Sequence, residues 1–170
     1  AGLVWGLANS GNEEDFYYDV VTGVSAGAIN AAGMAGYARD EVKAAAQFLS
    51  DTWSGLTNPK IWKLYDGEGL IKGCLKEHGC LDDSPLVALI DGLLKGFPQG
   101  FKKRVTVASA NVGTGQYETF TQGNTSWEDF HYAAVASGSI PGAFPPMHYD
   151  GMVLMDGGTI WDVNLPSAVK

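Results

Sequence analysis

The chain is poor in basic residues and in long apolar runs. Only 11 of its 170 residues are Lys or Arg, against 19 Asp or Glu, and the formal net charge is −8. This balance argues against a nucleic-acid partner, because binding to phosphates needs a basic surface. The one basic run, residues 102–104, precedes a predicted strand. We interpret it as a solvated edge, with contact to anionic lipid headgroups as the alternative.

No apolar run approaches the roughly 20 residues of a membrane-spanning helix, so we expect no transmembrane segment. The uncharged stretch from Tyr132 to Tyr149 is interrupted by prolines at 141, 145 and 146. A proline removes a backbone donor and ends a helix. We therefore expect a helix end followed by a loop in this stretch.

Cysteine and histidine are scarce as well, with two Cys and three His. Cys74 and Cys80 with His78 between them make a poor zinc pattern, because a structural zinc site uses four ligands. We expect neither a metal nor an organic cofactor. A disulfide between the two cysteines, like the sequon beginning at Asn124, favours a secretory route, whereas free thiols favour the cytosol. The sequence leaves the pairing, the compartment and the oligomeric state open.

What the chain does contain is a globular composition, with 45% hydrophobic and 18% charged residues. Strand and helix patterns alternate, which predicts an α/β layered fold with a mostly parallel central sheet. Residues 117–121 are expected to form an antiparallel hairpin with the strand before them, and the segment 54–80 is expected to be irregular. The expected strands are 16–22, 104–110, 117–121 and 152–155, and the expected helices are 1–7, 28–35, 40–52, 84–94 and 126–136.

The most informative feature is the G-x-S-x-G element formed by Gly23, Val24, Ser25, Ala26 and Gly27. It lies between a predicted strand and a predicted helix, the setting typical of a nucleophile elbow. We expect the glycines to permit a strained turn. The serine hydroxyl would then lie at a helix N-terminus, where free N–H groups and the helix dipole can stabilise an oxyanion. The alternative is a glycine-rich turn with an incidental serine.

A serine nucleophile needs a base, and the histidines are poorly placed to supply it. His78 lies in the irregular segment, and His131 lies within a predicted helix. His148 is the one histidine that we consider as a base. None follows Asp156, where the usual order of nucleophile, acid and histidine would put it.

Asp156 is the better candidate base. It ends an apolar strand directly before Gly157 and Gly158, and functional groups of a parallel sheet gather at the carboxyl ends of its strands. A partly desolvated carboxylate that accepts a hydrogen bond from the serine can act as general base without histidine. The alternative is a simple turn, since Asp and Gly favour turns.

These motifs together resemble the patatin-like phospholipase family, and the resemblance covers nearly the whole chain. That family pairs a G-x-S-x-G serine with the aspartate of a D-G-G or D-G-A motif, which correspond here to Ser25 and Asp156. Residues 136–146 (ASGSIPGAFPP) are similar to its A-S-x-A-x-P-x-x-F-P-P loop. Residues 108–115 and 162–166 also resemble its segments.

The resemblance implies a three-layer α/β/α fold and a lipid acyl hydrolase of the phospholipase A or lysophospholipase type. Its Ser-Asp dyad would act through an acyl-enzyme on a lipid ester, at a membrane or lipid surface. An α/β-hydrolase that uses His148 is a further alternative, and His148→Ala would separate the two, since the dyad predicts mostly retained activity.

One departure from the family pattern concerns its glycine-rich D-G-G-G-x-R/K-G oxyanion loop, which residues 1–16 do not match. We expect residues 1–170 to be a single patatin-like domain that lacks its N-terminal strand and this loop, with its C-terminal end open to truncation as well. The alternative is a catalytically inactive domain with a structural or partner-binding role.

Overall fold

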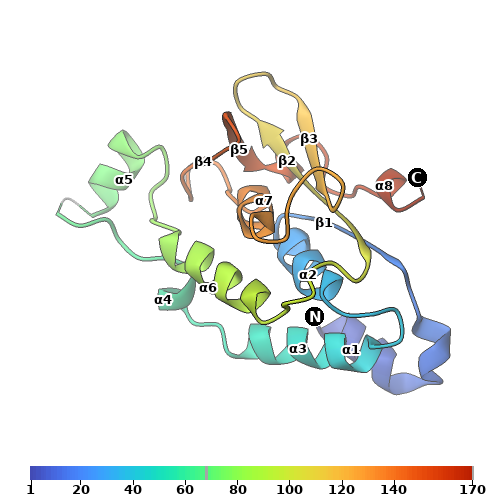
Figure 1. Cartoon of the computed structure of the whole chain (residues 1–170). Helices are drawn as coiled ribbons and strands as arrows, with labels where there is room; N and C mark the ends of the chain where they lie inside the picture. Colours follow the sequence, from blue (N-terminus) through green and yellow to red (C-terminus); the bar gives the residue numbers. More distant parts are fainter. Residues whose placement is uncertain (68, 170) are drawn as a thin grey trace.

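The computed structural model describes residues 1–67 and 69–169, which fold around one five-stranded sheet (Figure 1). The strands are β1 (Val20–Val24), β2 (Arg104–Asn111), β3 (Tyr117–Thr121), β4 (Met147–Tyr149) and β5 (Met152–Asp156). The α-helices are α1 (Gly2–Ser10), α2 (Ala26–Ala35), α3 (Val42–Ser54), α4 (Asn58–Ile61), α5 (Leu70–Lys76), α6 (Ser84–Lys95), α7 (Phe130–Ser137) and α8 (Pro166–Val169). Two 3-10 turns, η1 (Glu13–Phe16) and η2 (Gly157–Thr159), complete the described elements.

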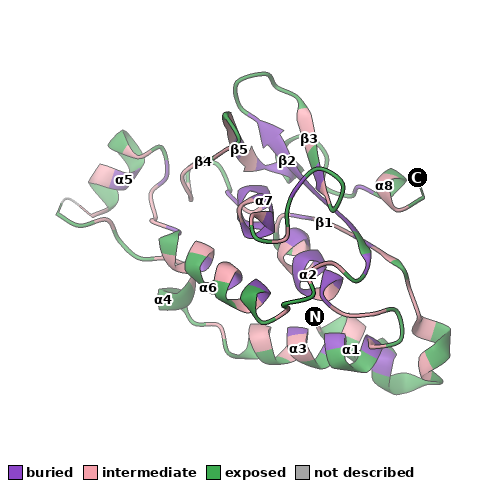
Figure 2. Cartoon of the chain, in the orientation of Figure 1, coloured by how far each residue is buried: buried purple, intermediate pink, exposed green. Residues whose placement is uncertain are grey.

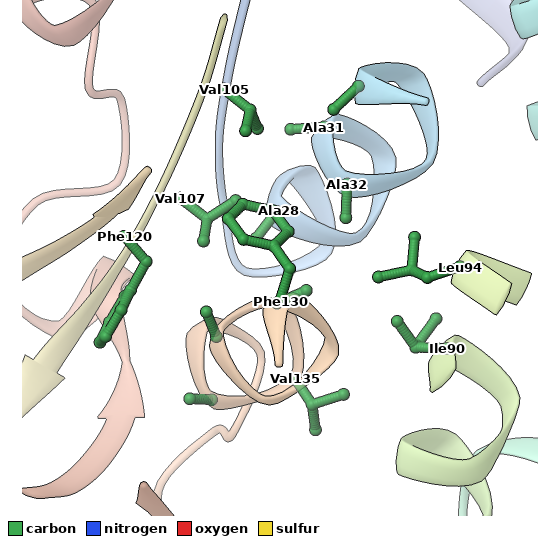
Figure 3. Close-up of a cluster of buried hydrophobic side chains, with 14 of the residues drawn as sticks. Ala28, Ala31, Ala32, Ile90, Leu94, Val105, Val107, Phe120, Phe130 and Val135 are labelled. Atoms are coloured by element: carbon green, nitrogen blue, oxygen red, sulfur yellow. The ribbon is translucent and has the colours of Figure 1, made fainter. Parts of the chain in front are cut away.

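The hydrophobic core lies between the sheet and its helices (Figures 2 and 3). Helices α2 and α7 lie against one face of the sheet, and α6 packs against these two helices. Alanines at 28, 31, 32 and 35 line the buried side of α2 and allow a close approach to the strands. Phe130 of α7 and Leu154 of β5 are fully buried at the centre. The strand that leads to Ser25 therefore rests on a densely packed layer.

The sheet is mixed. Strands β1 and β2 pair in parallel, whereas β2–β3, β2–β5 and β4–β5 are antiparallel. The α/β alternation and the β2–β3 hairpin are confirmed, but parallel pairing is a smaller part of the sheet than the sequence predicts. One contribution is the short hairpin of β4 and β5, because strands joined by two residues can only run antiparallel. Asp150 and Gly151 form that connection, both with positive φ, as the tight Asp-Gly hairpin turn requires.

The structure contains short elements that the sequence analysis did not predict. Strand β4 falls where a loop was expected, and α4 and α5 fall in the segment expected to be irregular. Residues 62–67 and 69–80, which we call the disulfide lobe, carry α5 away from the sheet (Figure 1). Within the part of the chain that the structure describes, no helix has the length and apolarity needed to cross a bilayer.

Candidate active site

Ser25 occupies a sharp turn between β1 and α2. Its φ of 56° and ψ of −131° lie outside the regions that L-residues prefer, a conformation that costs about 1–3 kcal/mol. The strain therefore falls on the serine, not on the glycines to which the sequence analysis assigned it. Gly23 is needed for another reason, since a Cβ there would lie 2.0 Å from the Gly27 carbonyl oxygen. A Cβ on Gly27 would meet nothing within 4 Å.

Asp156 lies within hydrogen-bond distance of the serine. Ser25 Oγ donates to Asp156 Oδ2 at 2.7 Å, and the aspartate is almost completely buried. The other carboxylate oxygen, Oδ1, accepts from Gly158 N at 2.8 Å. The Asp156 backbone N–H donates to the Ser139 carbonyl oxygen at 2.9 Å. Both carboxylate oxygens therefore have hydrogen-bond partners, and the backbone at residues 156 and 158 is fixed by hydrogen bonds as well.

Strand register explains why two residues so distant in sequence meet. Strand β3 lies opposite residues 106–110 of β2, so β1 and β5 must share the other edge of that strand. There β1 runs parallel opposite residues 104–108, and β5 runs antiparallel opposite 109–111. Their carboxyl ends consequently converge from opposite directions. Ser25 directly follows one end, and Asp156 is the other.

Ser137, which the sequence analysis did not single out, supports the turn. It is fully buried at the end of α7, and its Oγ accepts a hydrogen bond from the Ser25 backbone N–H at 2.9 Å. The same hydroxyl donates to the Ala108 carbonyl oxygen. The residue thus ties the strained serine to the central strand. The only signal in the sequence was its place inside the family-like stretch 136–146.

The N-terminus of α2 offers a donor beside the serine. Ala26 is the first residue of this helix, and the first N–H groups of a helix have no acceptor within it. The positive end of the helix dipole lies at the same place and favours a developing negative charge. The Ser25 N–H is already used by Ser137, so the backbone donor that the turn offers beside Ser25, within the described residues, is the Ala26 N–H.

A narrow apolar cavity of about 170 Å³ adjoins Ser25. Its walls come from α2, α3, α4, α6 and the loop after α7. The lining residues are Ser25, Ala26, Ile29, Thr52, Trp53, Leu56, Ile61, Leu86, Leu89, Ile90, Gly138, Ile140 and Phe144. Its size matches the volume of about six water molecules at roughly 30 Å³ each, which is room for a short stretch of hydrocarbon.

The histidines lie elsewhere. His148 is an exposed residue of β4, and it lines a separate cavity of about 490 Å³ together with His78. His131 is a buried residue of α7, and its Nδ1 lies 2.8 Å from the Glu128 carbonyl oxygen. Among residues 1–67 and 69–169, the hydrogen bond of Ser25 Oγ goes to Asp156 and not to a histidine. The geometry thus gives His148 no part in the site.

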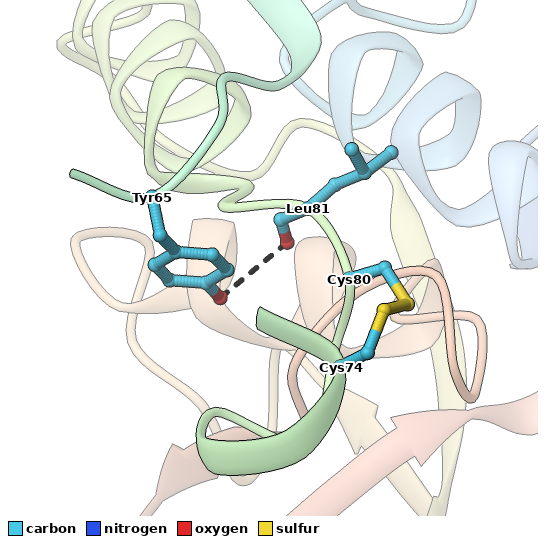
Figure 4. Close-up of a disulfide and its surroundings, with 4 residues drawn as sticks. All are labelled: Tyr65, Cys74, Cys80 and Leu81. Carbon is cyan, nitrogen blue, oxygen red and sulfur yellow. Dashed lines mark hydrogen bonds between the residues drawn. A yellow bond between two sulfur atoms is a disulfide. The ribbon is translucent and has the colours of Figure 1, made fainter. Parts of the chain in front are cut away.

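The structure shows whether the two cysteines are paired, which the sequence left open. Cys74 and Cys80 are joined in a disulfide at the base of the disulfide lobe (Figure 4). Over the described ranges, no group of three or more His, Cys, Asp or Glu residues gathers where it could hold a metal ion.

Fold and site together define an α/β protein with a serine on a strand-to-helix turn and a carboxylate hydrogen-bonded to it. The family model for patatin-like phospholipase matches residues 1–169, and the chain therefore belongs to that family. The mixed α/β architecture is consistent with its three-layer fold. No curated protein matches the chain. Membership supports lipid acyl hydrolysis as the general class of activity.

Proposed function

We propose that the protein is a phospholipase A or lysophospholipase-type esterase in which Ser25 is the nucleophile and Asp156 the general base. The observation that carries this proposal is the 2.7 Å hydrogen bond from Ser25 Oγ to Asp156 Oδ2. A hydroxyl at its ordinary pKa is a weak nucleophile and needs an adjacent base. The strained turn presents the hydroxyl, and the hydrogen bond aims its proton at the carboxylate.

The reaction would proceed in two halves. Asp156 accepts the Ser25 proton while Oγ attacks the ester carbonyl carbon, and the resulting oxyanion is stabilised by the Ala26 N–H. The tetrahedral intermediate then breaks its bond to the leaving alcohol, which takes the proton from Asp156. In the second half, water gives a proton to Asp156 and attacks the acyl-enzyme. Release of the fatty acid returns that proton to Ser25.

The apolar cavity beside Ser25 would hold the first carbons of the acyl chain. Its walls offer aliphatic and aromatic side chains, such as Ile29, Leu86 and Phe144, and burial of hydrocarbon against such a surface is favourable. An acyl group in this position would bring its carbonyl carbon to Ser25 Oγ. The substrate that fits is therefore a lipid ester at a membrane or other lipid surface.

The test is release of fatty acid from phosphatidylcholine and lysophosphatidylcholine by the full-length protein. We expect activity in the wild type, its loss in Ser25→Ala and Asp156→Asn, and mostly retained activity in His148→Ala. Loss in His148→Ala alone would favour a histidine base instead.

Absence of hydrolysis by a folded wild type would favour an inactive patatin-like domain with a structural or partner-binding role.

A further inference from the structure

Helix α5 turns its apolar side chains outward. Leu70, Ile71 and Leu75 are 51%, 66% and 76% exposed, whereas the buried residue of this helix is Gly73. A Cβ on Gly73 would lie 2.6 Å from the Cys80 carbonyl oxygen, so the helix packs through its glycine. In a surface helix of a soluble protein the apolar stripe normally faces the core. Here the orientation is reversed.

The disulfide lobe holds the helix in this orientation. The Cys74–Cys80 disulfide and the hydrogen bond from the Gly79 N–H to the Gly73 carbonyl oxygen fasten α5 to the strand-like segment that follows it. Tyr65 Oη donates to the Leu81 carbonyl oxygen at 3.4 Å and braces the other side of the lobe (Figure 4). The outward apolar face is therefore a built feature of the lobe.

The charges on α5 suit the headgroup layer of a membrane. In a chain with 11 basic and 19 acidic residues, this helix carries Lys72 and Lys76 and no acidic residue. At 100° per residue Lys72 falls about 60° from Leu75 at the edge of the apolar arc, where a long side chain can extend to a phosphate while its stem covers hydrocarbon. The Lys72 Nζ lies 3.7 Å from Glu77 Oε1, and such exposed pairs are weak enough to exchange for a phosphate.

The disulfide lobe is also continuous with the wall of the serine cavity. The Cys80 N–H donates to the Gly142 carbonyl oxygen at 3.0 Å, and the Leu81 N–H donates to the Ala143 carbonyl oxygen at 2.9 Å. The residues on either side of this paired segment, Ile140 and Phe144, line the cavity at Ser25. Any external surface that binds α5 therefore lies close to the loop that encloses Ser25.

Two other groups of exposed apolar residues lack this charge pattern. One is on α1, with Leu3, Trp5 and Leu7, and the other lies in the segment 160–169. Neither contains a Lys or Arg residue, and the second contains an aspartate. Among the three groups, α5 alone combines exposed aliphatic side chains with basic ones.

We propose that the outward face of α5 is the surface with which the protein binds a phospholipid bilayer. This inference rests on the proposed function, since a lipid ester must reach Ser25 from such a surface. Leu70, Ile71 and Leu75 enter the boundary between headgroups and acyl chains, and Lys72 contacts a phosphate. The short helix lies in the plane of the interface and brings the cavity rim to the lipid.

The experiment measures binding and not turnover, so its failure is distinguishable from failure of the proposed function. Full-length Ser25→Ala protein is floated with vesicles of ether-linked phosphatidylcholine, which cannot be hydrolysed. Ile71→Ser/Leu75→Ser is compared with the matched control Leu3→Ser/Leu7→Ser on α1. We expect the α5 variant to bind at least about tenfold more weakly, since membrane binding scales with buried apolar area, and the α1 control to bind as the parent does.

Hydrolysis of a soluble short-chain ester by the same two variants with Ser25 intact checks that the fold and the site survive, and we expect it to be unchanged. Unaltered vesicle binding by the α5 variant, or no binding by the parent, would overturn the proposal. A dimer in sedimentation velocity that dissociates on Ile71→Ser/Leu75→Ser, without vesicle binding, would also overturn it and assign the face to a second copy of the chain.

Discussion

The nucleophile elbow and the disulfide lobe each hold a helix in a defined orientation, but by different means. The elbow is fixed from within, through close backbone packing at Gly23 and partly buried hydrogen bonds to Ser137 and Asp156. The disulfide lobe is fixed by a covalent bridge and a few backbone hydrogen bonds, while its large apolar side chains stay exposed. Chemistry at a single atom requires the first kind of support. A surface that meets a fluid layer of lipid can use the second.

The largest effect that would break the elbow is expected from Gly23→Ala. Its Cβ would overlap the Gly27 backbone, with 2.0 Å to the carbonyl oxygen, and backbone atoms cannot move aside cheaply. We expect a loss of about 3 kcal/mol or more in the free energy of unfolding, measured by denaturant titration. Gly27→Ala is the matched control and should be neutral or stabilising by up to about 1 kcal/mol, because alanine favours a helix over glycine. Equal losses in the two variants would contradict this account of the turn.

The second effect concerns the disulfide lobe and leaves the elbow untouched. Cys74→Ser/Cys80→Ser opens a short covalent ring that constrains the unfolded lobe, a contribution of about 2–3 kcal/mol. We expect limited proteolysis within residues 62–80 to become about 30-fold faster, since a loss of about 2 kcal/mol raises the open population by that factor. The wild type with its disulfide reduced should be cleaved at the same faster rate. An unchanged rate of cleavage would show that the hydrogen bonds hold the lobe without the disulfide.

Ser137→Ala should weaken the elbow by about 2 kcal/mol. It leaves the Ser25 N–H and the Ala108 carbonyl oxygen without their side-chain partner in a buried place, and an unsatisfied buried group costs about 1–3 kcal/mol. The reaction of Ser25 with a serine-directed probe should slow in parallel. Ser139→Ala is the control, because its hydroxyl bonds the Val135 carbonyl oxygen and not Ser25. A similar slowing in both variants would argue against a specific role for Ser137.

The smallest effect lies where the disulfide lobe joins the core, at Asp83. Burial, with a smaller contribution from the Asp82 carboxylate, raises the pKa of Asp83 to about 6. The folded state therefore binds this proton more tightly than the unfolded chain, and stability falls as pH rises from about 4 to 6. Asp83→Asn should raise the free energy of unfolding by about 1–2 kcal/mol at pH 7 and leave it unchanged at pH 3.5, as measured by denaturant titration at the two pH values. An equal increase at both pH values would show that titration of Asp83 is not its cause.

The elbow could be predicted from the sequence because its signals are local. A β-rich run, a G-x-S-x-G turn and an alanine-rich helix follow one another within residues 16–35, and β1 and α2 lie there, although β1 begins at Val20 and not at Phe16 as expected. Strand β3 was predicted with its observed bounds, since aromatic and β-branched residues follow a glycine turn there. The contact of Ser25 with Asp156 is different in kind. It depends on two strands sharing one edge of β2, which no local pattern records, and it was anticipated from the place of Asp156 at a strand end and from the family resemblance.

Helix α5 of the disulfide lobe was missed because it has only seven residues and contains Gly73, which lowers its intrinsic helix propensity. Its apolar residues recur at helical spacing, but a pattern this short does not distinguish a helix from an irregular segment, and it does not reveal that Leu70, Ile71 and Leu75 are exposed. Strand β4 was missed for its length of three residues. Its Asp150-Gly151 turn is a strong hairpin signal, and this dipeptide predicts the antiparallel pair that is observed in place of the expected loop.

The central claim is that Ser25 is an activated nucleophile and Asp156 its base. Labelling of the full-length protein with a fluorophosphonate probe tests it most directly, beside Ser25→Ala, Asp156→Ala and His148→Ala. The account predicts labelling of the wild type and of His148→Ala, none in Ser25→Ala and a strong reduction in Asp156→Ala. A folded wild type that does not label, or an Asp156→Ala protein that labels at the wild-type rate, would contradict it.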